Sequence, residues 1–172
     1  MKRIVPHDPH WPALFDKEAK VIADVLGRAS VGLHHIGSTA IPGLQSKPII
    51  DILVEASSLS ALDSCTERLA DNGYEARGEY GISGRRYFKK KPNSETIGFH
   101  LHAYLAGSYQ IRRHLAFRDY LLLKPEIAAQ YDALKTELSF PDGRLKPEYQ
   151  HAKKPFVDGT ALKALRHFRF SG

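Results

Sequence analysis

The sequence predicts an α+β fold in which helices pack on a mixed β-sheet and the C-terminal third of the chain is helical. Strand-like and helix-like segments alternate over residues 1–73, several short strand-like segments follow at 74–105, and helical patterning fills the remainder. With 172 residues and no repeat or linker-like stretch, the chain is expected to form one domain over 1–172.

The first expected element is a helix in HDPHWPALFDKEAKVIADVLG. Asp8 is its expected N-cap, Pro9 its first-turn proline and Gly27 its end, and apolar residues recur between them at three- and four-residue spacing. The segment SVGLHHI at 30–36 alternates in polarity and predicts a short strand. The segment KPIIDILVEA at 47–56 is apolar on both faces, so it is expected in the interior of the sheet.

A second helix is expected over 57–73, with Ser60 and Asp63 as a capping box and Gly73 at its end. Glycines and a Pro-Asn pair then divide 74–105 into short strands. In TIGFHLHAYL the apolar and polar positions alternate, which is typical of a half-buried strand. The last expected helices are at 108–123, 125–139 and 160–169.

Charge and composition limit the kinds of partner. A formal net charge of +6 favours anionic partners without choosing among nucleotides, nucleic acid and other acidic ligands. The basic segment GRRYFKKKP at 84–92 is interpreted as a solvated hairpin rather than a nucleic-acid patch, so nucleic acid is the less favoured partner. No apolar run reaches the roughly 20 residues that span a bilayer, and no secretory signal is recognised. A cytoplasmic location without membrane contact is therefore expected.

The loop in HHIGSTAIPGLQSKP is a possible anion site. It lacks the Gly-Lys-Ser/Thr of a Walker loop and the G-x-G-x-x-G of a dinucleotide fingerprint. Gly37, Ser38 and Thr39 stand where a helical turn can begin, and backbone N–H groups with two hydroxyls are suited to phosphate oxygens. The alternative interpretation is that Ser38 and Thr39 are ordinary turn residues.

Asp51 lies within the apolar strand that follows this loop, and a buried carboxylate needs a cationic partner. Position 53 is leucine, and Glu55 is about 13 Å further along the strand, so the strand offers one good metal ligand. Asp51 is therefore expected to bind a metal ion and to be the catalytic carboxylate. The alternative is a structural ion pair with Lys47 or an arginine.

The segment FHLHAY supplies two more ligands, because His100 and His102 share one face of a strand and can approach one metal ion. If this strand neighbours the strand of Asp51, the three residues form one group, which His35 is expected to join from the first strand. The expected cofactor is a divalent ion (Mg, Mn or Zn), and imidazole ligands favour zinc or another borderline metal. Two histidines hydrogen-bonded at a sheet edge are the alternative.

Basic residues are expected to meet the phosphate oxygens of a ligand, although each is otherwise an ordinary surface charge. The expected residues are Lys47, Arg85, Arg86, Arg118, Lys135 and Lys153.

Several motifs, taken in order, resemble the GrpB family nearly from end to end. They are VPHDPHWPALFDKE, HIGSTAIPGLQSKPIIDI, GISGRRYF, FHLHAY, FRDYLLLKPEIAAQYDALKTEL and YQHAKKPF, of which the second is the most specific.

This resemblance implies a nucleotidyltransferase-like fold, in which a Gly-Ser turn precedes an Asp-x-Asp strand. By this resemblance Gly37 and Ser38 hold phosphates and Asp51 binds metal, whereas the second acidic position is Leu53. The usual third carboxylate corresponds to His100 or His102, so the ordinary two-metal route is not expected.

The function expected from the resemblance and the site residues is binding of a nucleotide or other phosphorylated small molecule, with metal-dependent nucleotidyl or phosphoryl transfer to an unidentified acceptor. The alternatives are a binding module without turnover and a metal-dependent hydrolase that uses the histidines.

Overall fold

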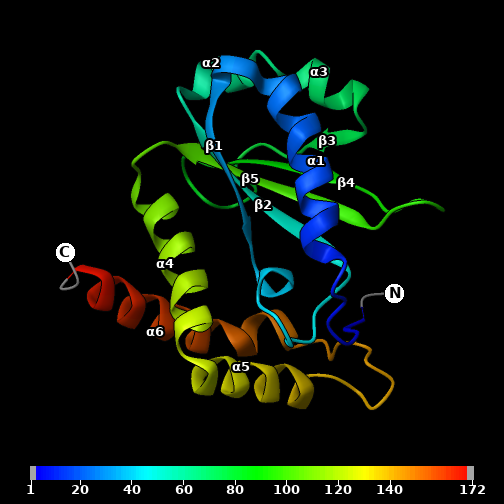
Figure 1. Cartoon of the computed structure of the whole chain (residues 1–172), viewed down its shortest axis with the longest axis vertical. Coiled ribbons are helices and arrows are strands. Elements are labelled where there is room, and N and C mark those ends of the chain that lie inside the picture. Colours follow the sequence, from blue (N-terminus) through cyan, green and yellow to red (C-terminus); the bar gives the residue numbers. More distant parts are fainter. Residues whose placement is uncertain (1–2, 170–172) are drawn as a thin grey trace.

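The computed structural model describes residues 3–169 and shows a five-stranded mixed sheet with helices against both faces (Figure 1). The elements in chain order are α1 Trp11–Leu26, β1 Ser30–Ile36, β2 Ile49–Ala56, α2 Leu59–Asp63, α3 Thr66–Asp71, β3 Tyr74–Ala76, β4 Arg86–Lys90, β5 Gly98–Leu105, α4 Tyr109–Leu123, α5 Pro125–Glu137 and α6 Tyr149–Arg169. Two single turns of 3-10 helix, η1 Gly27–Ala29 and η2 Ser38–Ala40, flank β1.

The strands are arranged in the order β1-β2-β5-β4-β3. Strands β2 and β5 are parallel, and the other neighbouring pairs are antiparallel. The interior position predicted for 47–56 is confirmed, since β2 lies between β1 and β5 and five of its apolar side chains are buried. A continuous apolar run suits a strand that is covered on both faces.

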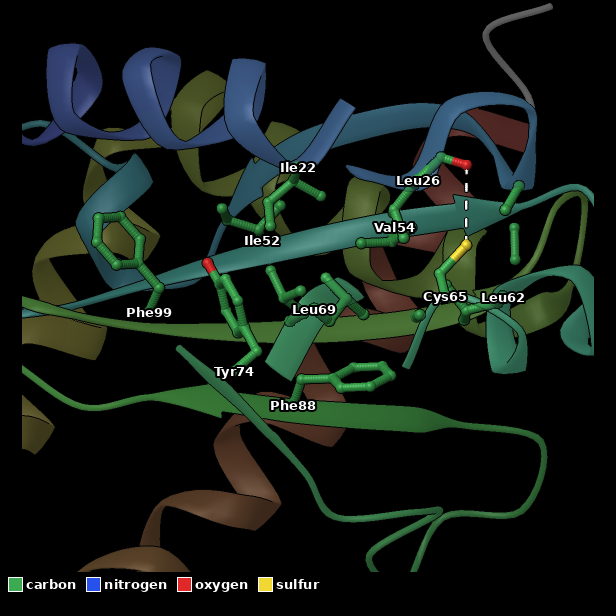
Figure 2. Close-up of a cluster of buried hydrophobic side chains, with 14 of the residues drawn as sticks. Ile22, Leu26, Ile52, Val54, Leu62, Cys65, Leu69, Tyr74, Phe88 and Phe99 are labelled. Carbon is green, nitrogen blue, oxygen red and sulfur yellow. Dashed lines mark hydrogen bonds between the residues drawn. The ribbon is translucent and has the colours of Figure 1, made fainter. Parts of the chain in front are cut away.

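One face of the sheet carries the main hydrophobic core, beneath α1, α2 and α3. Figure 2 shows Ile22 and Leu26 of α1 above Ile52 and Val54 of β2. The only cysteine of the chain, Cys65, is buried in the same core, with its Sγ 3.9 Å from the carbonyl oxygen of Leu26.

The opposite face of the sheet is partly covered by α4. Ile36, Leu53 and Tyr104 pack there against Ile111 in a smaller apolar cluster. Helices α5 and α6 extend this layer beyond the end of β1 (Figure 1). The predicted fold class, a mixed sheet with packed helices and a helical C-terminal third, is confirmed.

Helix α1 begins later than predicted. Its N-cap is His10, and Pro12 rather than Pro9 occupies the first turn. The Asp8 carboxylate accepts the N–H of His10 at 2.9 Å in a turn before the helix, so it does not cap α1.

The helix predicted over 57–73 is two short helices, α2 and α3. The residue that caps α2 is Ser58, whose Oγ accepts the N–H of Ala61 at 3.1 Å, so the predicted capping box is wrong. At the break, the hydroxyls of Ser64 and Thr66 bind backbone carbonyls of the preceding turn, as short polar side chains do at helix ends.

The last helix begins at Tyr149, well before the predicted start at 160. Pro155 lies inside it, at an exposed position. Within residues 3–169, no helix combines the length and apolar character needed to cross a bilayer.

Candidate functional site

Asp51, His100 and His102 meet on the sheet face that α4 partly covers. The parallel pairing of β2 and β5 sets Asp51 beside His100 and Leu53 beside His102. Oδ1 of Asp51 lies 2.8 Å from Nε2 of His102 and 3.6 Å from Nδ1 of His100. One ligand atom from each residue lies within 4.8 Å of the other two. We call these three residues the Asp51 group.

The Asp51 group is partly buried, and its side chains are 31%, 24% and 16% exposed for Asp51, His100 and His102. Burial acts to raise the pKa of Asp51, but the two imidazoles overcome it and hold this pKa far below its usual range. The carboxylate is therefore ionised at neutral pH. An anionic oxygen beside two imidazole nitrogens is a donor set suited to a borderline divalent metal.

The glycine turn lies directly beside this carboxylate. Antiparallel pairing of β1 and β2 sets Ile36 opposite Asp51, so the chain leaves β1 at the level of the acid. Gly37 has φ +75°, and a Cβ atom there would lie 2.8 Å from Oδ2 of Asp51. Ser38 opens the η2 turn and interacts with the hydroxyl of Tyr131, a buried residue of α5 whose pKa is raised by burial to about 12.

Two lysines from distant parts of the chain meet near the Asp51 group. Nζ of Lys47 and Nζ of Lys153 lie 5.7 and 5.1 Å from the ring centroid of Tyr149. The pKa of Lys153 is lowered to about 8, chiefly by burial and then by the charge of Lys47, and the charge of Asp51 opposes both effects. The two ammonium groups repel each other, and an anion bound between them would stabilise both charges.

His35 and Thr39 are not brought into the Asp51 group. His35 pairs with Ile52, so its ring lies on the main-core face, stacked on Phe15 at 4.9 Å between ring centroids. Its Nε2 lies 2.9 Å from Oγ1 of the buried Thr39. Since alternate residues of a strand point to opposite faces, the prediction of His35 as a metal ligand is corrected to a structural contact with Thr39.

Three predicted phosphate ligands form structural contacts elsewhere. Arg86 makes two contacts to the carboxylate of Asp63, at 2.6 and 3.0 Å, beside the main core. Lys135 is 1% exposed and donates to the carbonyl of Gln45. Arg118 donates to the carbonyl of His35 at 3.2 Å. Each of these three charges has a partner within the protein, and their role towards phosphate stays a prediction.

Two residues of the site were not predicted. Tyr87 of β4 has its hydroxyl 3.0 Å from Nδ1 of His100, and burial, followed by the Asp51 charge, raises its pKa to about 12. His114 of α4 has its ring centroid 6.1 Å from that of His102, and burial lowers its pKa to about 3. Tyr87 could have been considered from the sequence, because it lies in a strand-like segment. Nothing in the helical pattern around His114 indicated that it belongs to the site.

Two cavities lie away from the Asp51 group. A cavity of about 380 Å³ is lined by residues between 140 and 150, including Tyr149. Another, of about 470 Å³, lies between α4 and α6 and is lined by Leu115, Leu162 and Phe168 among others. None of the Asp51 group lines either of these two cavities.

Comparisons with known proteins agree with the sequence resemblance. The GrpB protein family matches residues 2–163. UPF0157 protein YqkA of Bacillus subtilis is 44% identical over 163 residues, which cover 95% of this chain and 47% of that protein, so the chain spans about half of this relative.

Solved structures give the same relationship. The crystal structure of conserved protein GrpB from Enterococcus faecalis matches with a TM-score of 0.86 and 36% identity, over 96% of this chain and 98% of that chain. A much lower likeness, in fold alone, is to terminal uridylyl transferase 4 from Trypanosoma brucei with bound CTP, with a TM-score of 0.47 and 13% identity over 77% of this chain and 40% of that chain. The match over almost the whole sequence and the close structural agreement establish that the chain belongs to the GrpB family.

Proposed function

We propose that this protein binds a nucleotide or another phosphorylated ligand together with one divalent cation, and transfers a nucleotidyl or phosphoryl group from it. The observation that carries the proposal is the meeting of Asp51, His100 and His102 beside the Gly37 turn. The pair Lys47 and Lys153 adds positive charge near the same carboxylate. Together these features provide ligands for a cation and a counter-charge for phosphate.

The ligand set favours zinc or manganese over magnesium. Two imidazole nitrogens and one carboxylate oxygen suit borderline metals, whereas magnesium prefers oxygen ligands and retained water. A divalent ion bound there would polarise a phosphate oxygen and offset negative charge.

The chain's own residues supply orientation and charge. Tyr87 contacts Nδ1 of His100 and thereby orients the ring. Gly37, which has no side chain, lets the turn approach the carboxylate of Asp51 closely. Lys47 and Lys153 are placed to neutralise phosphate oxygens, which gain charge as a phosphorus–oxygen bond breaks.

A second function, ligand binding without turnover, is favoured by Leu53. This leucine is fully buried against Ile36 and Tyr104, at the position where the nucleotidyltransferase pattern has its second acid. The next acid of the strand, Glu55, lies 2.6 Å from Nε2 of His34 and is already paired. Chemistry that needs two metal ions therefore lacks a ligand on β2.

Nucleotide turnover can separate these functions. Purified protein is incubated with γ-phosphate-labelled ATP, CTP, GTP or UTP and magnesium, manganese or zinc, and release of labelled pyrophosphate is measured. We expect release by the wild type, loss in Asp51→Asn, and no change in Asp24→Asn, a matched change of an exposed carboxylate on α1. Binding without release supports the binding module, and release of inorganic phosphate supports the hydrolase. Absence of both binding and release would overturn the proposal.

Metal content tests the ligand set separately. The protein is dialysed against zinc or manganese, and bound metal is counted by atomic emission. We expect about one ion per chain in the wild type and in His151→Ala, which changes an exposed histidine of α6. The double variant His100→Ala with His102→Ala should bind none; an unchanged metal content would remove the histidines from the site.

A further inference from the structure

Two tyrosines and two cations form a group beside the Asp51 group, which we call the Tyr80 group: Tyr80, Arg85, Tyr87 and Lys89. Tyr80 lies in the loop between β3 and β4, and its side chain is 58% exposed. Tyr87 and Lys89 lie on β4, opposite His102 and His100 of β5. Residues opposite each other in an antiparallel pair share a face, so the Tyr80 group lies on the same face as the metal ligands.

Ring contacts lead from Tyr80 to the histidines. The ring of Tyr87 lies 5.2 Å from that of Tyr80, 5.5 Å from that of His100 and 5.1 Å from that of His102, measured between centroids. Nζ of Lys89 lies 4.7 Å from the Tyr80 centroid and 5.2 Å from the Tyr87 centroid. Tyr87 thus lies between the Asp51 group and the exposed ring of Tyr80, and the ammonium group of Lys89 lies near both tyrosine rings.

The loop that presents Tyr80 is held in a rare conformation. Tyr80 is the only non-glycine residue among 3–169 with positive φ, at +46°, which is unfavourable for a bulky side chain. The buried Arg85 donates to the carbonyls of Glu79 and Tyr80 at 3.0 and 2.6 Å. The Glu79 carboxylate accepts the N–H of Gly84 at 2.7 Å. Arg85, predicted to meet phosphate, instead fixes this loop.

A strained position that the surroundings hold in place is a reason to look for function there. The local contacts fix the backbone of Tyr80, yet most of its side chain remains in solvent, where a large aromatic ring has little packing to gain. The ring of Tyr80 is therefore already positioned before a ligand binds. A ligand that stacks on it causes little further loss of conformational entropy in the protein.

We propose that the ring of Tyr80 is the stacking surface for the base of a nucleotide, with Lys89 beside it. This inference rests on the proposed function and narrows its ligand to nucleotides. Strands β1 and β4 are three strand spacings apart, about 14 Å, so the Gly37 turn and Tyr80 lie at opposite ends of the site. A ligand that contacts both has phosphates at one end and a flat ring at the other, which describes a nucleoside triphosphate.

Calorimetric titration with ATP and with inorganic triphosphate, each with manganese, tests this inference. The two ligands share the phosphate chain, and only ATP carries a base. We expect Tyr80→Ala and Tyr80→Asn to weaken ATP binding about tenfold and to leave triphosphate binding within twofold. Asparagine tolerates positive φ, so Tyr80→Asn removes the ring without added backbone strain. Tyr80→Phe, which keeps the ring, should bind ATP like the wild type.

The matched control is Tyr109→Ala, which removes a tyrosine of similar exposure (49%) from the start of α4. It should change neither affinity. Equal wild-type affinity for ATP and triphosphate, or ATP affinity unchanged in both Tyr80→Ala and Tyr80→Asn, would overturn the stacking role while leaving phosphate binding intact. Failure of the wild type to bind either ligand would overturn the proposed function, and this inference with it.

Discussion

Gly37 and Asp51 lie so close together that a Cβ atom on Gly37 would lie 2.8 Å from Oδ2 of Asp51. The backbone at Gly37 also has φ +75°, in the region that favours glycine. The conformation of the turn after β1 and the position of the Asp51 carboxylate therefore depend on each other. A side chain at position 37 must displace the carboxylate or the turn.

Gly37→Ala is expected to disrupt both stability and ligand binding. Positive φ alone costs an alanine about 1 kcal/mol, and the contact with Asp51 adds to this. Gly43→Ala is the matched control, because Gly43 has φ +82° and open space where its Cβ would lie. Urea unfolding should show a loss in both variants, whereas metal and triphosphate binding should fall only in Gly37→Ala. Equal binding by the two variants would contradict the role of the contact.

Anion binding should weaken as the pH rises through about 8. Burial lowers the pKa of Lys153 to about 8, so its positive charge is present below this pH and lost above it. The charged and titratable groups that influence Lys153 or contact it are Lys47, Asp51, Lys135 and Tyr149. Triphosphate affinity measured from pH 6.5 to 9.5 should fall more steeply in the wild type than in Lys153→Arg, which stays charged. Because ionisation of triphosphate affects both proteins, parallel profiles would exclude Lys153 from the site.

His35 is expected to make the fold sensitive to acid. Burial lowers its pKa to about 4, against 6.5 for an ordinary histidine, so between these values only the unfolded chain takes up the proton. This contribution to stability is complete above pH 6.5 and is lost as the pH falls towards 4. The wild type should lose at most about 3 kcal/mol more than His35→Gln between pH 7 and 4. Urea unfolding at several pH values measures the difference; equal slopes would contradict the prediction.

Lys135 is expected to matter for stability through its contact with Gln45. Lys135→Met leaves the Gln45 carbonyl without this donor in a buried place, which should cost about 1–3 kcal/mol of unfolding free energy. Lys163→Met, at an exposed position of α6, removes the same charge and should stay within about 0.5 kcal/mol of the wild type. Comparable losses in the two variants would show that the charge, and not the buried contact, is what matters.

Much of the fold follows from local patterns in the sequence. The apolar spacing of 11–26 predicts α1, and the doubly apolar run around Asp51 predicts an interior strand. Alternation in FHLHAY places His100 and His102 on one face. Local signals failed where short-range hydrogen bonds compete with helix formation, as at Ser58 and Ser64.

The site depended on information that strand patterns do not hold. Alternation gives relative directions within one strand, but it does not say which face of β1 is shared with which face of β2. Register decided that Asp51 meets the histidines and that His35 lies on the other side. Likewise, only the packing of α6 brings Lys153 towards Lys47, about 100 positions earlier in the sequence.

The sequence by itself determined which chemical groups this protein has: an acid inside an interior apolar strand, a leucine two residues after it, two histidines on one face, and a glycine before a serine. Only the tertiary structure decided which of them meet, because pairing and packing minimise the free energy of the whole chain rather than of any short segment. The same long-range packing buried Lys135 and Arg85 in structural contacts. It left Tyr80 exposed near the histidines.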